Sequence, residues 1–411
     1  MAGILLSAYA CEPGRGSEPA LGWGWATELV RSGHRVWVLT RADNRPSIER
    51  DALATHPNLH FVYFDLSPWA QKWRRGFGKI LYYVLWQWCA VRHIRRLFPA
   101  LPFDVVQHVT YASGRYPSFM ASLGIPFYFG PVSGGERVSR CIRSNFSLAQ
   151  QCREWLRDMS NFIVPHDPMM RWVFQRADKL LVTPATLSLV PLRWRCKCRT
   201  QLAIGLTTEY LQHVTVSTPH DENCYRLLYV GRLLEWKGID LALDAVSQLK
   251  RSQPSARFTI VGDGPASARL HKVAEELSLS GVVDWIPWVP YNRVQEYYRD
   301  ADVFLFPSLR DSGGMAVLEA LAHGLPVVCT DLGGPGVIVD QSCGRVVSTG
   351  RNSRQQLVCA LVEALQEIAT APRLHGSLAA GARARARQFK FENLVASLHP
   401  PVQFPGVSLT A

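Results

Sequence analysis

One stretch of the sequence combines a backbone suited to binding an anion with a carboxylate nearby. The apolar run Val303–Phe306 has the composition of a buried parallel strand, and the loop after it contains Asp311 and ends at Gly313 and Gly314. A helical pattern begins at Met315. Two glycines at a helix start let backbone N–H groups approach an anion, and the helix dipole favours negative charge there. The stretch therefore predicts a phosphate site.

A second carboxylate, Glu319, stands in a helix that is otherwise rich in Ala, Leu and Met. It lies about one and a half turns into the helix, roughly 8 Å along its axis. A carboxylate there can accept from two vicinal hydroxyls, each bond contributing on the order of 1.5 to 3 kcal/mol. A ribose fits this description. A solvent-facing glutamate is the alternative, but the glycines and Asp311, eight positions earlier, favour a binding site.

Two cations follow an earlier strand-like run. Arg226–Val230 is followed directly by Gly231 and Arg232, and Lys237 and Gly238 come shortly after. Arg232 at a strand end and Lys237 at a helix start can both reach one diphosphate in a cleft between domains. Fixed cations stabilise the negative charge that grows on a departing diphosphate without needing a metal. Two solvated surface cations are the alternative.

These segments resemble the retaining glycosyltransferases of the GT-B fold, which use nucleotide-sugar donors. Members carry Pro-Ser, Glu-Gly-Phe-Gly, Leu-Glu-Ala and Gly-x-Pro-Val segments in the second domain. The matching segments here are Pro307-Ser308, Asp311-Ser312-Gly313-Gly314, Leu318-Glu319-Ala320 and Gly324-Leu325-Pro326-Val327. The sequence departs from the family at Asp311, where most members have glutamate, and at Ser312-Gly313-Gly314, which replaces Gly-Phe-Gly.

The resemblance implies a role for each residue of this set. Arg232 and Lys237 would hold the diphosphate, and Glu319 would hold the ribose. The donor would also contact the N–H groups of Gly313, Gly314 and Met315, and its sugar would contact Asp311.

A motif known from metal-dependent enzymes is present, but it lies at the wrong end of a strand for ligand binding. Asp300-Ala301-Asp302 spells the acidic triplet of metal-dependent glycosyltransferases of the other major fold. It precedes a buried strand at the amino end, whereas ligands of open α/β sheets bind outside the carboxyl ends. The ten cysteines lack the paired spacing of metal ligands. We therefore expect reduced thiols, no metal site and no cofactor.

A glycine-containing loop also follows the first strand-like run, Gly3–Ser7. It contains Gly14, Arg15 and Gly16, and a helical pattern begins directly after it. A tight turn between strand and helix explains the glycines equally well. The resemblance favours a loop that faces the donor phosphate or the acceptor, which makes Gly14 and Gly16 candidate substrate contacts.

His108 lies at the carboxyl end of another strand-like run, residues 104–107. Such runs alternate with helical patterns through the first half, which predicts a doubly wound α/β domain. A lone histidine is more often structural. In related glycosyltransferases a histidine after this strand lies near the transferred sugar, so the resemblance implies that His108 contacts the sugar or the acceptor.

Residues 69–101 interleave aromatic and aliphatic side chains with lysines and arginines. One or two basic amphipathic helices of this kind can lie in the interface of an anionic membrane. A helix packed on the sheet, with a solvated basic face, is the alternative. The formal net charge of +12 suits either nucleotide phosphates or anionic lipid.

The chain of 411 residues, 47% of them hydrophobic, is long enough for more than one domain. We expect an α/β protein with two Rossmann-like domains facing across a cleft, residues 1–218 and 224–385. Residues 217–223 have the composition of a linker. By resemblance, residues 386–399 form a helix that crosses back to the first domain. No leader and no spanning helix are predicted, so we expect a cytoplasmic protein, with attachment to the inner membrane face as a hypothesis.

The predicted reaction is transfer of a hexosyl unit from a nucleoside diphosphate sugar to a hydroxyl of a glycan or lipid-linked glycan, with retention implied by the resemblance. A nucleotide-sugar epimerase of the same fold is one alternative. A basic, non-catalytic nucleic-acid-binding protein is another. That class predicts exposed cationic stripes with stacking aromatics, whereas the aromatic residues here fall mainly in strands and one amphipathic helix. We therefore expect no nucleic-acid partner.

Overall fold

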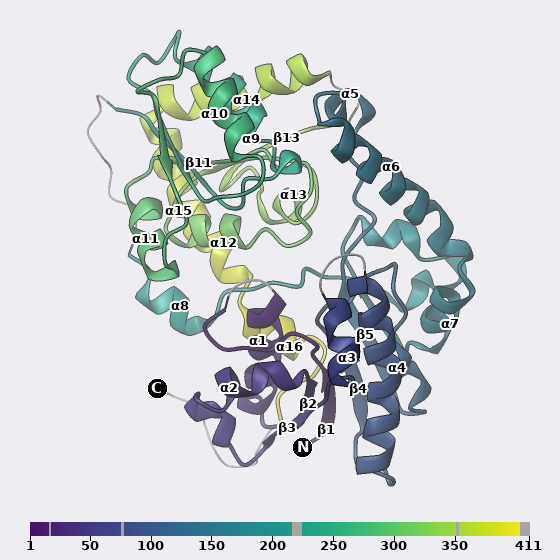
Figure 1. Cartoon of the computed structure of the whole chain (residues 1–411). Coiled ribbons are helices and arrows are strands. Elements are labelled where there is room, and N and C mark those ends of the chain that lie inside the picture. The colour runs from purple at the N-terminus through teal and green to yellow at the C-terminus, as the bar shows by residue number, and fades with distance from the viewer. Residues whose placement is uncertain (16–17, 75–77, 216–223, 351–352, 403–411) are drawn as a thin grey trace. The chain divides into compact units, whose positions relative to one another are not determined.

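The computed structural model describes residues 1–15, 18–74, 78–215, 224–350 and 353–402, and the chain divides into two compact units (Figure 1). Unit 1 consists of Met1–Gly135, Met159–Ala203 and Phe391–Ala411. Unit 2 consists of Glu136–Asp158 and Ile204–Lys390. The linker predicted at residues 217–223 lies outside the described residues.

Unit 1 contains a seven-stranded parallel sheet with the order β3-β2-β1-β4-β5-β6-β7. Its strands are β1 Gly3–Ser7, β2 Arg35–Thr40, β3 Leu59–Tyr63, β4 Val105–His108, β5 Phe127–Val132, β6 Lys179–Val182 and β7 Cys198–Thr200. The strand order reverses between β1 and β4. In doubly wound sheets, ligands bind outside the carboxyl ends of the strands at such a reversal.

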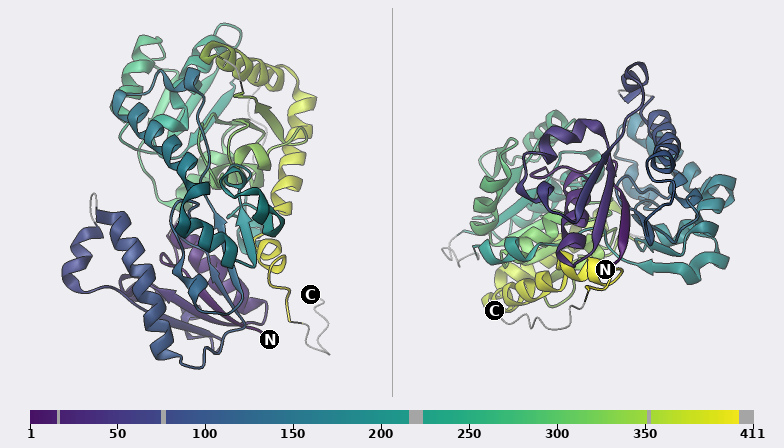
Figure 2. Two further views of the ribbon diagram at one scale, coloured as in Figure 1. Left: turned by 90° about the vertical axis from the view of Figure 1, so that its right-hand side faces the viewer. Right: turned by 90° about the horizontal axis from the view of Figure 1, so that it is seen from below.

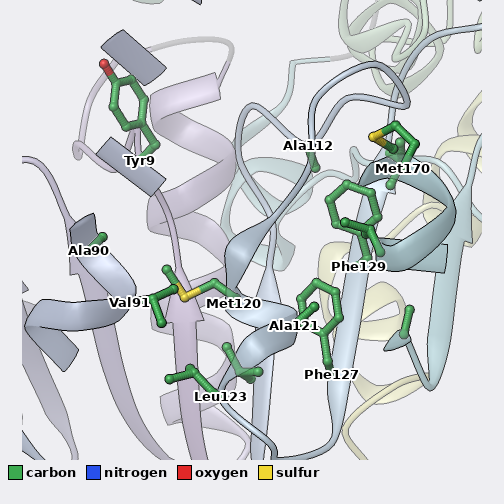
Figure 3. Packing of buried hydrophobic residues seen from close by; sticks show 14 of the residues in the cluster. Tyr9, Ala90, Val91, Ala112, Met120, Ala121, Leu123, Phe127, Phe129 and Met170 are labelled. Carbon is green, nitrogen blue, oxygen red and sulfur yellow. The ribbon is translucent and has the colours of Figure 1, made fainter. Parts of the chain in front are cut away.

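The pleat of β1 divides the core of unit 1 into two clusters. Ile4 and Leu6 point to the cluster formed with α1 and α16, whereas Leu5 points to the cluster formed with α4 and α7. Figure 3 shows the second cluster, with Phe127 and Phe129 of β5 among its members. The helices of unit 1 are α1 Glu18–Arg31, α2 Arg45–Ile48, α3 Pro68–Gln71, α4 Lys79–Leu97, α7 Pro168–Arg176 and α16 Phe391–Ala396.

Unit 2 contains a six-stranded parallel sheet with the order β10-β9-β8-β11-β12-β13. Its strands are β8 Arg226–Val230, β9 Arg257–Val261, β10 Val283–Ile286, β11 Val303–Phe306, β12 Val327–Thr330 and β13 Gly344–Val347. Here the order reverses between β8 and β11, the two strands that precede the predicted cations and the glycine loop. Both units are doubly wound, which confirms the predicted α/β fold class.

The helices of unit 2 pack in pairs, α9 with α14 and α12 with α15. Residues 317–322 of α12 are all buried, as expected for a helix whose residues other than Glu319 are apolar on every side. The helices of this unit are α5 Arg140–Arg143, α8 Thr208–His213, α9 Ile239–Leu249, α10 Ser267–Glu276, α11 Tyr291–Arg299, α12 Met315–Ala322, α13 Pro335–Ile338, α14 Arg354–Thr370 and α15 Pro372–Gln388. Helix α6, Leu148–Ile163, continues from unit 2 into unit 1.

Candidate functional site

The candidate site lies where the strand order of unit 2 reverses. β8 and β11 are paired in parallel, so the loops that follow them leave the same edge of the sheet. The N–H of Leu309 donates to the carbonyl oxygen of Trp236 at 2.9 Å, which joins the two loops. A Cβ atom on Gly238 would lie 2.1 Å from the carbonyl oxygen of Pro307. Glycine at position 238 therefore permits the loops to approach this closely.

Lys237 and Asp311 form the charged centre of this edge. The Nζ atom of Lys237 donates to Oδ2 of Asp311 at 2.6 Å, and both side chains are largely buried. The other carboxylate oxygen, Oδ1, accepts from the N–H groups of Gly313 at 3.1 Å and Gly314 at 2.9 Å. The carboxylate thus rests between a lysine and the amides at the start of α12. This environment fits an anion.

A third loop supports the first two through its backbone. Gly334, after β12, donates its N–H to the carbonyl oxygen of Asp311 at 2.7 Å. A Cβ atom would lie 2.0 Å from that oxygen if placed on Gly333, and 1.9 Å from the carbonyl oxygen of Gly313 if placed on Gly334. These glycines were not among the predicted site residues. The Gly333-Gly334-Pro335 run after a buried strand was the signal that could have identified them.

Glu319 is buried within unit 2, so the solvent-facing alternative is wrong. The hydroxyl of Tyr298 in α11 donates to its Oε2 atom at 3.0 Å. The Tyr298 ring stacks on His323, with ring centroids 5.3 Å apart and planes 19° apart. Tyr298 therefore fixes the orientation of the carboxylate. The sequence around Tyr298 does not mark it as a site residue, because α11 and α12 approach each other only in the folded unit.

Arg232 follows β8, and hydrogen bonds fix the backbone at this position. Its side chain is exposed. Its carbonyl oxygen accepts from the Tyr229 hydroxyl at 3.2 Å, and the next residue, Leu233, donates its N–H to the carbonyl oxygen of Asp263 at 3.0 Å. Within the described ranges, its guanidinium has no carboxylate partner. Arg232 therefore differs from Lys237, whose charge is already balanced by Asp311.

Arg310 is a further cation beside Asp311 that sequence analysis did not identify. Its Nη1 atom lies 2.5 Å from Oε1 of Glu154, and its guanidinium lies 4.2 Å from the centre of the Trp236 ring. Burial lowers the pKa of Arg310 from its ordinary value. Glu154 belongs to the segment 136–158, which the chain contributes to unit 2 from the first half of the sequence.

The predicted contacts in unit 1 lie near the strand reversal of its own sheet. Gly14, after β1, is exposed and has a φ of 68°, and a Cβ atom there would meet nothing within 4 Å. Gly16 lies outside the described residues. Arg15 forms an ion pair with Glu12 at 2.8 Å. The role predicted for these glycines stays a prediction.

His108 ends β4 and is fully buried among hydrogen-bond partners. Its Nε2 atom lies 3.0 Å from the carbonyl oxygen of Thr110 and 3.1 Å from the hydroxyl of Tyr83. Its Nδ1 atom lies 2.6 Å from Oγ of Ser118. A ring that donates from Nε2 to Thr110 and accepts at Nδ1 from Ser118 satisfies these contacts in the neutral state. The predicted sugar contact of His108 stays a prediction.

Two buried histidines predict that unit 1 loses stability in acid. Burial lowers the pKa of His108 to about 4, and burial together with neighbouring cations lowers the pKa of His399 to about 3. Both folded values lie below the ordinary value of 6.5. Stability is therefore full above that value and falls as the pH drops toward the folded values, because the unfolded chain takes up the protons first.

Urea unfolding across this pH range checks the prediction, with an expected loss on the order of a few kcal/mol. His108→Gln removes one titrating ring and should make the pH dependence shallower. The matched change on the exposed surface of unit 2, His213→Gln, should leave it as in the wild type. An equal pH dependence in wild type and His108→Gln would contradict the assignment.

Comparison with known proteins finds a family that matches part of the chain. Residues 215–383 match the model of the family described as glycosyl transferases group 1. This part of the chain is similar to the group 1 glycosyltransferases. The matched region contains the Lys237–Asp311 centre, the glycine loops and Glu319, so the candidate site of unit 2 lies within the part that matches the family.

Sequence relatives support the same family over part of the chain. The chain is 35% identical over 144 residues to WcaL of Salmonella typhimurium, a glycosyltransferase named for colanic acid biosynthesis. The alignment covers 33% of this chain and 35% of WcaL. The alignments with the first curated relatives cover 26% to 42% of those relatives' lengths.

Solved structures show that the chain has the GT-B fold. Sucrose-phosphate synthase of Thermosynechococcus elongatus is 18% identical, with a TM-score of 0.64 over 97% of this chain and 98% of that one. HepE of Anabaena, solved with UDP-glucose, is 15% identical, with a TM-score of 0.61 over 98% of this chain and 100% of that one. At these identities the likeness concerns the fold alone.

Proposed function

We propose that this glycosyltransferase moves a hexosyl unit from a nucleoside diphosphate sugar to a hydroxyl of a glycan or lipid-linked glycan, with retention of anomeric configuration. The observation that carries the proposal is the carboxylate of Asp311, held by Lys237 and by the amides at the start of α12. A largely buried carboxylate in this position marks a place that accepts negative charge. A donor phosphate would compete with Asp311 for the same lysine and amides.

Each residue then has a chemical task. Lys237 and the exposed Arg232 stabilise the charge that grows on the leaving diphosphate, so this proposal needs no metal. The Glu319 carboxylate, oriented by Tyr298, accepts hydrogen bonds from the ribose hydroxyls. Asp311, once released from Lys237, is available to a hydroxyl of the sugar, and the amides of Gly313, Gly314 and Met315 face the donor.

Two relatives support the choice of substrates. The HepE structure contains UDP-glucose, which supports a nucleoside diphosphate hexose as donor. WcaL is named as a glycosyltransferase of colanic acid biosynthesis, which supports a glycan acceptor. The sugar, the base and the linkage are to be found by screening donors.

A donor screen with two arginine variants tests this function. UDP-glucose and other nucleoside diphosphate hexoses are titrated by calorimetry, and products are analysed with glycan acceptors, with and without a chelator. Arg232→Gln is expected to weaken donor binding by about tenfold, from the loss of one charge-assisted contact. The control is Arg257→Gln, an exposed arginine at the amino end of β9, which should bind as the wild type.

Other outcomes would overturn the proposal. Absence of binding to every donor removes the nucleotide-sugar site. Conversion of the donor to an isomer without any acceptor product would identify an epimerase instead. Loss of transfer on chelation would contradict the assignment of charge stabilisation to Arg232 and Lys237.

A further inference from the structure

Helix α6 carries a row of large apolar side chains on its solvent-exposed face. The helix is labelled in Figure 1 and lies on the side that faces the viewer in the left view of Figure 2. Its exposed apolar residues are Leu148, Trp155, Leu156, Met159, Phe162 and Ile163, with exposed fractions between 40% and 84%. Their spacing of three, four and seven residues places them on one broad face.

The opposite face of α6 is polar, and it is buried and bonded. Glu154 accepts from the side chain of Gln150 at 2.8 Å and pairs with Arg310. Near the end of the helix, Asn161 accepts twice from the guanidinium of Arg115, at 3.1 and 2.6 Å. Breaking such buried polar contacts is costly. The rotation of α6 about its axis is therefore fixed, and its apolar face stays outward.

The charges around this face are mainly positive. Residues 137–176 contain seven arginines and three carboxylates. All three carboxylates are engaged: Glu154 pairs with Arg310, Asp158 pairs with Arg143, and Asp167 caps α7. The exposed arginines are Arg137, Arg140, Arg153 and Arg176. A partner for this surface is therefore apolar and anionic.

We propose that α6 lies in the interface of an anionic lipid bilayer, with Trp155 and Phe162 inserted among the headgroups and Arg153 near the lipid phosphates. A broad stripe that contains tryptophan and phenylalanine, flanked by arginine, is the composition of interfacial helices. A narrower seam is typical of a helix that pairs with another helix. The proposal is independent of the transfer reaction.

A cavity in unit 1 is also lined by aromatic side chains and arginines. It has a volume of about 430 Å³ and lies between α4, the 3₁₀ turn Phe119–Ser122 and the start of α7. Trp88, Met169 and Trp172 line it together with Arg92 and Arg95. Aromatic side chains and arginines thus also meet beside α7, the helix that follows α6 in the chain.

The helix that the sequence suggested for membrane contact is α4, within residues 69–101, and not α6. One face of α4 packs in the core of unit 1, with Tyr82, Trp86 and Ile94 among its buried side chains. This agrees with the packed-helix alternative for that face. Ile80, Leu81, Trp88 and Leu97 of α4 stay exposed, and the first two provide a test of the earlier hypothesis. None of the helices in the described ranges has the length and apolar character needed to cross a membrane.

Vesicle sedimentation of the full chain tests the proposal. The wild type is expected to bind vesicles of phosphatidylcholine and phosphatidylglycerol, and to bind pure phosphatidylcholine more weakly. The double variant Trp155→Ser with Phe162→Ser should lower the partition coefficient at least about tenfold, because two aromatic side chains no longer leave water. Arg153→Gln should weaken binding to the anionic vesicles by a fewfold and leave binding to pure phosphatidylcholine unchanged.

Two control variants locate the contact. Leu192→Ser removes another exposed leucine of unit 1 and should bind as the wild type. Ile80→Ser with Leu81→Ser should also bind as the wild type. All these side chains are exposed, so circular dichroism and thermal unfolding should match the wild type.

Three results would overturn the proposal. One is failure of the wild type to bind the anionic vesicles, and another is equal binding by the Trp155→Ser and Phe162→Ser double variant. The third is a dimer in sedimentation equilibrium, without vesicles, that dissociates in this double variant. That result would assign the face to a second copy of the chain.

Discussion

Replacing Lys237 with alanine is expected to lower the turnover of sugar transfer by about two to three orders of magnitude, the usual effect of removing one fixed group that stabilises transition-state charge. The lysine is largely buried, and its amino group lies 2.6 Å from the Asp311 carboxylate. Partial exclusion from water makes its charge more effective than that of a surface lysine. The loss should fall mainly on kcat, because the charge on the diphosphate grows as the bond to the sugar breaks.

Steady-state kinetics with a saturating donor measures this effect. The matched control is Lys272→Ala, an exposed lysine of α10 in the same unit, which should keep the wild-type rate. Lys237→Arg keeps the positive charge but places it on a planar guanidinium, so this variant should retain part of the activity. A Lys237→Ala variant with unchanged kcat would remove the lysine from the proposed reaction.

Asp311 explains why this lysine is held in place before any donor binds. Its side chain is short enough to accept from the N–H groups two and three positions later, as aspartate commonly does in turns. A glutamate, one methylene longer, would place its carboxylate differently over the same amides. The departure from the family's glutamate therefore has a local consequence: in this chain the first acidic residue accepts from the two glycine amides that precede α12 and balances Lys237.

The strands could be predicted because parallel strands are buried on both faces and read as short apolar runs. The predicted run Gly3–Ser7 coincides with β1, and Val303–Phe306 coincides with β11. The strand β7, Cys198–Thr200, has two exposed residues and lies at the edge of its sheet, so the sequence carries no apolar signal for it. A strand could therefore be predicted where it is buried on both faces, as β1 and β11 are, and strand propensity alone did not predict β7.

Part of the candidate site was visible because glycines and charges close to strand ends leave a local pattern. Lys237 and Asp311 each follow a strand by a few residues, and the fold brings them to 2.6 Å. Tyr298 and the pair of Glu154 with Arg310 leave no such pattern, because each depends on packing between distant segments. In α6 the polar face is buried and the apolar face is exposed. The sequence shows an amphipathic helix there but not which face is buried, so this arrangement could not be predicted.

The second large effect is expected from Gly334→Ala, which should lower the free energy of unfolding of unit 2 by roughly 2 to 4 kcal/mol, from overpacking and the loss of a buried contact. The φ of Gly334 is −62°, which alanine adopts easily. Steric contact alone opposes the change: the added methyl group would lie 1.9 Å from the carbonyl oxygen of Gly313. The loops after β11 and β12 must separate to accommodate it.

That separation should also damage the site, which distinguishes this variant from a simple loss of stability. The hydrogen bond from the N–H of Gly334 to the carbonyl oxygen of Asp311, 2.7 Å long, is lost when the loops move apart. Asp311 then no longer holds Lys237 against α12, and donor binding should weaken at temperatures where unit 2 is still folded. Calorimetric unfolding and donor titration on the same sample separate the two effects.

The control is Gly376→Ala within α15, where a methyl group meets nothing within 4 Å. Helix propensity predicts that this control gains about 0.5 to 1 kcal/mol of stability. A Gly334→Ala variant that unfolds and binds donor as the wild type would show that backbone contact between these loops does not position the anion site.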